Sequence, residues 1–108
     1  MTTSFSNIYS DIPSHLPQEL FTLLLTHKNV RIERIVSQGQ RTPVGEWYDQ
    51  MQNEWVIMLQ GEAVIEYETM EQHSLKTGDF LFIPAHTKHR VSWTTTSQQT
   101  IWLAIFWL

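Results

Sequence analysis

EWVIMLQG at residues 54–61 and GDFLFIPAHTKH at residues 78–89 are the two stretches of sequence that decide the fold. Each contains four or five large apolar residues in a row near a glycine, and Pro84 ends the second run. Short apolar runs bounded by turn residues are typical of buried strands. Gly61 separates the first run from another β-rich run at residues 63–67, and this arrangement predicts a hairpin.

Further strands are expected on both sides of these two stretches. Residues 30–36 alternate between apolar and polar side chains, as in a half-buried strand. Residues 91–93 and 101–108 complete a series of short strands that turns separate, which predicts an all-β sandwich or barrel. The one helical pattern starts at Pro17, where leucines recur at helical spacing, and we expect a short N-terminal helix over residues 17–26.

Length and composition are those of one globular domain. The chain has 108 residues, 42% of them hydrophobic, and five tryptophans, which is enough apolar material for one core. No linker-like stretch divides it. We therefore expect a single domain over residues 1–108, with an N-terminal arm and helix at residues 1–29 and a β-barrel at residues 30–108.

Charge and cysteine content exclude several classes of function. The formal net charge is −4 and the seven basic residues are scattered, which argues against nucleic acid and anionic membranes as partners. The absence of cysteine excludes disulfides and thiolate metal sites. Residues 1–6 lack the features of a secretory signal and residues 101–108 are too few to span a membrane, so we expect a cytoplasmic protein.

The two stretches that decide the fold also resemble the two sequence motifs of the cupin family. In the first cupin motif a His-x-His pair precedes a glutamate and, after six further residues, a glycine, which Glu54 and Gly61 match. In the second, a glycine is followed after five residues by Pro-x-Gly and then by a histidine, which Gly78, Pro84 and His89 match. The resemblance covers close to half of the chain and implies an antiparallel cupin or jelly-roll β-barrel.

Four positions depart from the cupin motifs. Tyr48 and Gln50 occupy the positions of the two first-motif histidines, His86 that of the Pro-x-Gly glycine, and Trp93 that of the final asparagine. The stretch at residues 47–50 is nevertheless similar to a group of short bacterial cupins of uncharacterised role.

The resemblance implies a polar site inside the barrel. In cupins the matching residues converge on a divalent metal, so Gln50, Glu54 and His89 are candidate ligands for iron, manganese, nickel, copper or zinc. Gln50 offers only a neutral carbonyl oxygen, which lowers the expected affinity. The alternative is a hydrogen-bonded polar cluster without metal. In either case we expect the three side-chain tips within about 6 Å of one another, with Tyr48 adjacent.

Residues around this site are candidates for binding a small molecule. The candidate ligand-binding residues are Tyr48, Gln50, Glu54, His89 and Trp93. Strand alternation places Trp93 on the same face as His89, where its ring could stack on an aromatic ligand. His86 is interpreted either as a residue at the rim of the barrel, which we favour, or as a general acid or base. Glu54 and His86 are therefore the candidate catalytic residues.

Two functions fit these residues. The first is a small-molecule-binding protein, a sensor or carrier, with or without a weakly held metal. The second is a metal-dependent enzyme, a dioxygenase or isomerase acting on a small carbonyl or aromatic substrate, in which Glu54 or His86 moves a proton. An oligomeric scaffold without a ligand fits less well, because burying these polar side chains costs free energy that no ligand would then offset.

The C-terminal segment predicts a homodimer. Residues 101–108 are apolar on both faces of a strand, whereas a barrel buries only one face. The expected helix can cover only part of the second face, and bulky exposed aromatic rings would form a larger patch than monomers usually tolerate. Packing against a two-fold mate would cover it.

Overall fold

The computed structural model describes residues 6–108, and within this part of the chain there are eight strands and no helix. The strands are β1 (Leu20–His27), β2 (Val30–Ser37), β3 (Asn53–Gln60), β4 (Glu62–Tyr67), β5 (Gln72–Lys76), β6 (Phe80–Ile83), β7 (His89–Thr94) and β8 (Thr100–Trp107). One sheet has five strands in the order β1-β2-β8-β3-β6, and the other has three in the order β5-β4-β7. All pairings are antiparallel, which confirms the expected all-β antiparallel fold.

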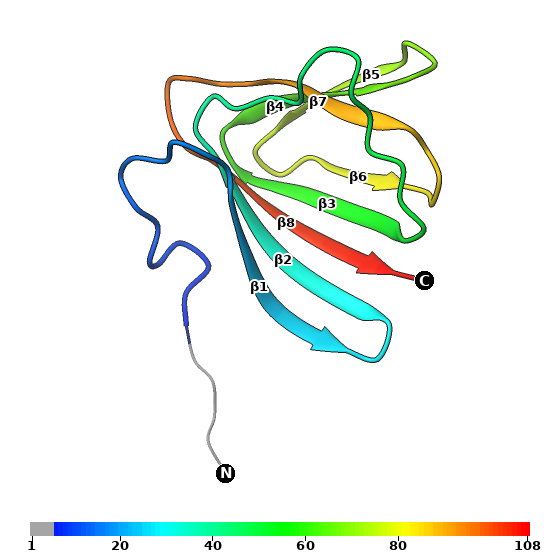
Figure 1. Ribbon diagram of the computed structural model, residues 1–108. Helices are drawn as coiled ribbons and strands as arrows, with labels where there is room; N and C mark the ends of the chain where they lie inside the picture. The colour runs from blue at the N-terminus through cyan, green and yellow to red at the C-terminus, as the bar shows by residue number, and fades with distance from the viewer. Residues whose placement is uncertain (1–5) are drawn as a thin grey trace.

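The two sheets face each other and enclose the main core (Figure 1). Strand alternation decides which side chains lie inside. Along β3, Glu54, Val56 and Met58 are buried, whereas the residues between them are only half-buried. The inward face of this strand therefore carries one carboxylate among apolar neighbours, and that carboxylate faces the space between the sheets.

Gly61 does not form the predicted hairpin but connects the two sheets. The flanking strands β3 and β4 belong to different sheets and do not pair with each other. Gly61 has a φ of 92°, and a Cβ built on it would lie 2.5 Å from Oγ1 of Thr100. Only glycine allows both this backbone conformation and this close approach, so the chain turns a corner here.

The predicted helix over residues 17–26 is wrong, because Leu20–His27 forms the edge strand β1. β1 pairs with β2 along its length, with one irregularity between Leu23 and Leu25. Leucine is a good helix former, but pairing with β2 supplies backbone hydrogen bonds that an isolated short helix could not match. The expected boundary between residues 29 and 30 therefore falls inside a hairpin.

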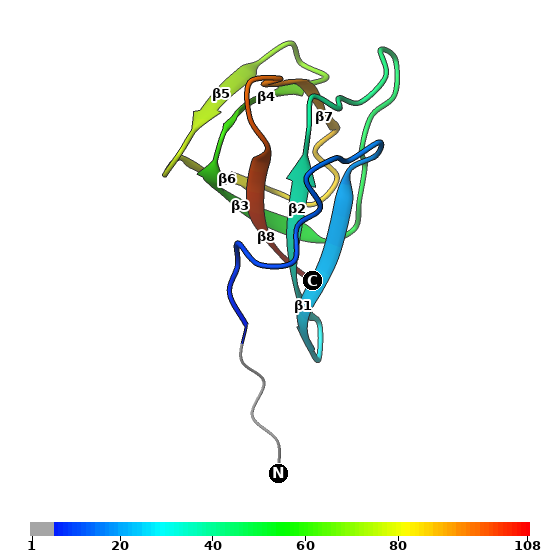
Figure 2. The ribbon, with the colours of Figure 1, turned by 90° about the vertical axis from the view of Figure 1, so that its left-hand side faces the viewer.

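The N-terminal arm covers one end of the outer face of the five-stranded sheet (Figure 2). Leu16 of the arm packs with Val36 and Ile101 in a second, smaller core. Arg34, which is buried, donates hydrogen bonds to the carbonyl oxygens of residues 8 and 10, at 3.0 and 2.6 Å. The first five residues of the expected arm lie outside the described residues.

The C-terminal strand β8 is apolar on both faces, as the sequence indicates. Its inner face contributes buried Trp102, Ala104 and Phe106 to the main core. On the outer face, at the end that the arm leaves open, the ring of Trp107 stacks on Phe82 with 5.9 Å between ring centroids. No helix in residues 6–108 is long and apolar enough to cross a membrane.

Candidate functional site

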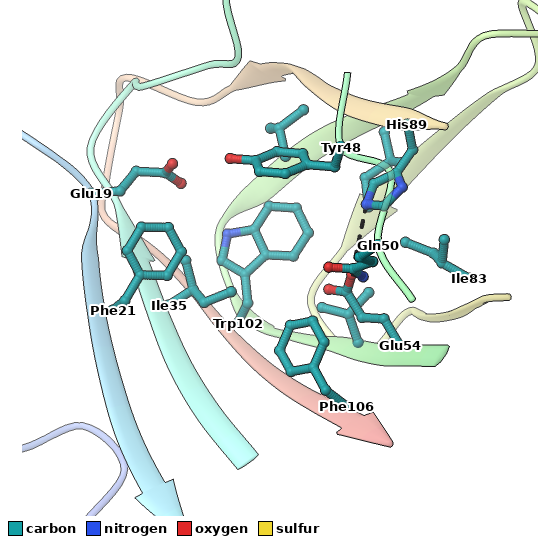
Figure 3. A pocket seen from close by; sticks show the side chains of 13 residues that line it. Glu19, Phe21, Ile35, Tyr48, Gln50, Glu54, Ile83, His89, Trp102 and Phe106 are labelled. Atoms are coloured by element: carbon teal, nitrogen blue, oxygen red, sulfur yellow. Dashed lines mark hydrogen bonds and ion pairs between the residues drawn. The ribbon is translucent and has the colours of Figure 1, made fainter. Parts of the chain in front are cut away.

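A pocket of about 590 Å³, counting its open mouth, lies between the two sheets. Its lining comes from every strand except β5, together with residues just before β1 and from the segment between β2 and β3. Most of the lining side chains are apolar or aromatic. Figure 3 draws Glu19 and the Trp102 nitrogen at one side of the pocket and Gln50, Glu54 and His89 at the other, with the Tyr48 ring between them. We call Gln50, Glu54 and His89 the base cluster, and Glu19, Tyr48 and Trp102 the mouth cluster.

The base cluster consists of the three residues that the sequence analysis gave as candidate metal ligands, and the structure places them side by side. Nε2 of Gln50 donates a hydrogen bond to Oε1 of Glu54 at 3.0 Å, and Nε2 of His89 lies 3.6 Å from the same oxygen. Only 9% of Glu54 and 5% of His89 are exposed. Glu54 thus faces the pocket from β3 and His89 from β7, and the carboxylate is the centre on which both neighbours converge.

Tyr48 is adjacent to the base cluster because its backbone is paired with that of His89. The amide of Tyr48 donates to the carbonyl oxygen of His89 at 2.7 Å, and the amide of His89 donates back at 3.1 Å. The two rings lie 5.6 Å apart. This isolated bridge fixes the loop before β3 against β7, and it sets the position from which Gln50 reaches Glu54.

The orientation of the His89 ring is fixed by a hydrogen bond on its far side. Nδ1 lies 2.8 Å from the carbonyl oxygen of Thr87, which can only accept, so Nδ1 carries a proton. Nε2 is therefore the nitrogen presented to Glu54. Burial disfavours the charged ring, but the Glu54 carboxylate and the Thr87 carbonyl outweigh it and raise the pKa of His89 above its usual value.

His86 lies at the rim of the barrel, as the favoured interpretation had it, and does not line the pocket. Its side chain is 66% exposed, with Nδ1 3.2 Å from a carboxylate oxygen of Asp49. Its φ is 61°, so the backbone keeps the left-handed conformation suited to the glycine of the cupin motif. The amide of His86 donates to the carbonyl oxygen of Gln50 at 2.8 Å. The residue supports the base cluster through its backbone, while its ring points elsewhere.

The structure places Trp93 outside the pocket, contrary to the expectation from strand alternation. Val91 does line the pocket, but the pairing of β7 with β4 shifts register between the partners of Val91 and Trp93. This bulge adds one residue and reverses the alternation, so that Thr94 is buried and Trp93 is 41% exposed. A prediction that assumes strict alternation along the strand cannot detect such an insertion.

The mouth cluster contains residues that the sequence analysis did not connect with the site. Glu19 directly precedes β1 and accepts a hydrogen bond from Oγ of Ser37 at 2.7 Å. Trp102 is only 4% exposed, and its Nε1 has no hydrogen-bond partner among the described residues. Phe21 and Phe106 add two more aromatic rings to the wall. Strand alternation in β8 could have placed Trp102 and Phe106 on the pocket side. Glu19 and Phe21 could not be placed there while residues 17–26 were interpreted as a helix.

Two carboxylates give the pocket a negative character. Glu19 and Glu54 both line it, and within residues 6–108 no lysine or arginine does. Burial and the charge of Glu19 raise the pKa of Tyr48, so its phenol stays protonated at neutral pH. Arg41 faces a neighbouring hollow, but Glu19 and Glu46 line that hollow too.

The donor set of the base cluster does not fit a tightly held transition metal. Glu54 and His89 are the only ionisable ligands in it, and the Gln50 amide donates to the carboxylate instead of adding an oxygen ligand. Residues 6–108 contain no group of three histidine, cysteine, aspartate or glutamate side chains placed to share an ion. Imidazole and carboxylate suit such metals, but one of each leaves most coordination positions open.

The family model described as the cupin domain matches residues 34–106. A solved structure from Ralstonia eutropha JMP134, described as a proposed mannose-6-phosphate isomerase, is 42% identical over 97% of this chain and 98% of its own, with a TM-score of 0.92. A cupin superfamily protein from Desulfitobacterium hafniense DCB-2 is 23% identical over 90% of this chain and 84% of its own, with a TM-score of 0.74. A conserved protein of unknown function from Streptococcus pyogenes is 16% identical over 99% of this chain and 89% of its own, with a TM-score of 0.75.

The two less identical structures show the fold alone. No curated protein matches the chain. The family model covers well over half of the sequence and includes every residue of the base cluster. The chain therefore belongs to the cupin family.

Proposed function

We propose that this cupin binds a small organic molecule without negative charge in the pocket between its sheets. The observation that carries the proposal is the base cluster, a buried carboxylate with its amide and imidazole neighbours in an otherwise apolar pocket. Buried polar groups of this kind add little stability compared with apolar packing, so a binding role accounts for them better than a structural one. Apolar walls with a few converging polar groups are typical of ligand sites.

The charge of the lining supports a neutral or cationic ligand. A phosphate or carboxylate entering the pocket would approach Glu19 and Glu54 without a lysine or arginine to pair with. Arg41 could attract an anion into the neighbouring hollow, but Glu19 and Glu46 oppose it there. The mannose-6-phosphate in the description of the Ralstonia protein therefore suggests the sugar part of a ligand here more than its phosphate.

We also propose that binding needs no tightly held transition metal. The family is one in which metals are common, and Gln50, Glu54 and His89 would be the ligands of a weakly held ion here. With one carboxylate and one imidazole, such an ion would exchange readily. Protein purified without chelator or added metal should contain far less than one equivalent of iron, manganese, nickel, copper or zinc by mass spectrometry. A stoichiometric metal would contradict this part of the proposal.

Isomerisation of a hydroxy-carbonyl compound is a second candidate, which the pairing of His89 with Glu54 favours. Because Nδ1 keeps its proton on the Thr87 carbonyl, Nε2 is the nitrogen that, in the neutral form of the ring, would accept a proton from the carbon next to a carbonyl group. The bond electrons would form an enediolate. Return of the proton from Nε2 to the former carbonyl carbon, with transfer of the hydroxyl proton to the former carbonyl oxygen, would complete the isomerisation. Following mannose in deuterated water by NMR tests this: an isomerase exchanges the proton, whereas a binding protein leaves it in place.

Partnership with a second copy remains a proposal that rests on the outer face of the five-stranded sheet. Phe80 and Phe82 are exposed at the end that the arm leaves open, where Phe80 packs at a tilt against Trp55 and Phe82 stacks on Trp107. Exposed aromatic rings of this number favour association. Light scattering at micromolar concentration should give twice the 12.8 kDa of the monomer. Recovery of the monomer mass would contradict a homodimer.

Fragment screening by NMR tests the binding proposal. Uniformly ¹⁵N-labelled protein would be titrated with neutral, cationic and anionic fragments of matched size. We expect neutral and cationic fragments to shift the amide signals of pocket residues such as Val56, Ile65 and Val91, while anionic fragments leave them unchanged. If no fragment shifts these signals, or if anionic fragments shift them most, the proposal is wrong.

A further inference from the structure

We propose that the mouth cluster recognises a hydroxyl group of a neutral, polyhydroxylated ligand, and that this hydroxyl sits between Nε1 of Trp102 and the carboxylate of Glu19. The inference rests on the proposed function, because it requires that the pocket binds a small molecule. It goes further by naming the functional group that the mouth of the pocket selects.

The first observation is an unused hydrogen-bond donor. Trp102 is 4% exposed, and its Nε1 has no partner among the described residues. Figure 3 shows the indole nitrogen turned toward the side of the pocket where Glu19 and Phe21 lie. Buried N–H groups are nearly always paired in folded proteins, so an unpaired one in a pocket wall indicates a missing acceptor.

The second observation is an acceptor that is only partly used. Oε2 of Glu19 accepts one hydrogen bond, from Ser37, which leaves lone pairs on both carboxylate oxygens. Glu19 lines the pocket on the same side as the Trp102 nitrogen and the Tyr48 hydroxyl (Figure 3). The mouth cluster therefore offers a donor and an acceptor in the same pocket, and Figure 3 draws both toward the same side of it.

A hydroxyl group is the functional group that matches this pair. Its oxygen accepts from the indole N–H of Trp102, and its hydrogen is donated to the carboxylate of Glu19. An ammonium group has no lone pair and would leave the Trp102 N–H unpaired. A carboxylate or phosphate could accept from Trp102 but would be repelled by Glu19, with no lysine or arginine lining the described pocket.

Access of a ligand to the Trp102 nitrogen requires side chains to move, because that atom is buried. Phe21 and Tyr48 line the pocket and are about half exposed, so their side chains can turn aside when a ligand enters. The protonated phenol of Tyr48 can then donate to a second hydroxyl of the same ligand. With the base cluster at the far side, the pocket presents polar groups at both ends of an apolar space, which suits a chain or ring of hydroxyl-bearing carbons.

Binding of matched sugars tests the inference. Calorimetry would compare mannose and erythritol with mannosamine, which carries an ammonium group, and with mannose 6-phosphate. We expect the neutral compounds to bind, mannose 6-phosphate to bind at least about tenfold more weakly than mannose, and mannosamine, which keeps its other hydroxyl groups, to bind no more tightly than mannose. Stronger binding of the amine or of the phosphate would overturn the inference.

Two substitutions locate the contact. Trp102→Phe should weaken mannose binding by about tenfold, because it removes the N–H donor. Glu19→Gln should weaken it by a smaller factor, because a neutral amide oxygen accepts more weakly than a carboxylate. Trp93→Phe and Glu62→Gln, the same changes at exposed positions outside the pocket, should leave it unchanged. Because Trp102→Phe also removes buried volume, a second form with 3-benzothienylalanine in place of Trp102 keeps the ring shape and lacks only the N–H.

The outcomes separate this inference from the proposed function. Suppose that fragments shift the pocket signals. The hydroxyl inference is then wrong, and the binding function stands, if mannose and erythritol do not bind. The same holds if the Trp102 and Glu19 replacements leave mannose binding unchanged. If no fragment shifts the pocket signals, both are wrong.

Discussion

The base cluster and the mouth cluster contain similar side chains, but they differ in how many hydrogen-bond or ion-pair partners the chain supplies to their polar atoms. In the base cluster the Glu54 carboxylate has an amide and an imidazole beside it, and His89 also bonds to a backbone carbonyl. In the mouth cluster the Trp102 nitrogen has no partner among the described residues, and Glu19 has one. A side chain whose partners are all within the chain is constrained by the fold, whereas one that lacks a partner is available to a ligand. The base cluster therefore presents a carboxylate and an imidazole whose positions the fold fixes, whereas the mouth cluster keeps polar atoms for which the described residues supply fewer partners.

The sharpest test of this difference is the same substitution at both ends. Glu54→Gln should lower the free energy of unfolding by about 2 kcal/mol, because it removes the charge that pairs with buried His89. Glu19→Gln should change it by less than about 0.5 kcal/mol, because the amide oxygen can still accept from Ser37. Urea denaturation at pH 6.5 measures both.

Equal losses of unfolding free energy in the two variants would contradict this expectation, since they would mean that both carboxylates stabilise the fold. Glu62→Gln, on an exposed part of β4, is the reference for a carboxylate without structural contacts.

His86 offers a test of how the base cluster is supported. His86→Gly should raise the free energy of unfolding by about 1 kcal/mol, because glycine adopts a φ of 61° without steric cost. The lost contact with Asp49 is exposed and worth little. The matched change His73→Gly, inside β5, should instead lower stability by about 0.5 to 1 kcal/mol. Thermal unfolding of the two variants should therefore shift in opposite directions, and a loss in His86→Gly would show that its side chain matters.

Much of the base cluster could be predicted from the sequence, because it depends on spacing along the chain. Glu54 and His89 occupy matching positions of two motifs, and Gln50 shares a segment with Tyr48 that pairs with His89. Spacing of this kind survives in the fold because the first motif forms β3 and the loop before it, and the second runs without a long insertion from the turn at Gly78 through β6 to the start of β7.

The mouth cluster could not be predicted in the same way, because it depends on which segments pair. Glu19 enters the pocket only because residues 20–27 form a strand at the edge of the sheet. The leucines of this segment favour a helix, whereas Phe21, Thr22 and Thr26 favour a strand, and tertiary pairing decides between them. The available signal was the two-residue connection at Lys28 and Asn29, which is typical of a hairpin.

Trp93 and Gly61 were misjudged for a related reason. A bulge in β7 reverses the alternation before Trp93, and the close contact with Thr100 makes Gly61 a corner between sheets. Both features come from neighbouring strands that are distant in sequence, so a pattern read along one strand does not contain them.

The smallest expected effect is the pH dependence of stability, which again separates the two ends of the pocket. The pKa of His89 is raised in the folded state, where burial opposes the charge but Glu54 and the Thr87 carbonyl favour it more strongly. The folded protein thus binds this proton more tightly than the unfolded chain does. The resulting stabilisation is fully present below the unfolded pKa, near 6.5, and is lost as the pH rises through the folded pKa.

Urea denaturation at a series of pH values from about 6 to 9 measures this loss. The wild-type protein should become less stable as the pH rises above about 6.5. Glu54→Gln removes the carboxylate that faces His89, so its stability should fall less over the same range. Glu19→Gln leaves the surroundings of His89 intact and should keep the wild-type slope. If the unfolding free energy of Glu54→Gln and Glu19→Gln changes equally with pH, Glu54 is not what raises the pKa of His89. The two ends of the pocket then do not differ in this respect.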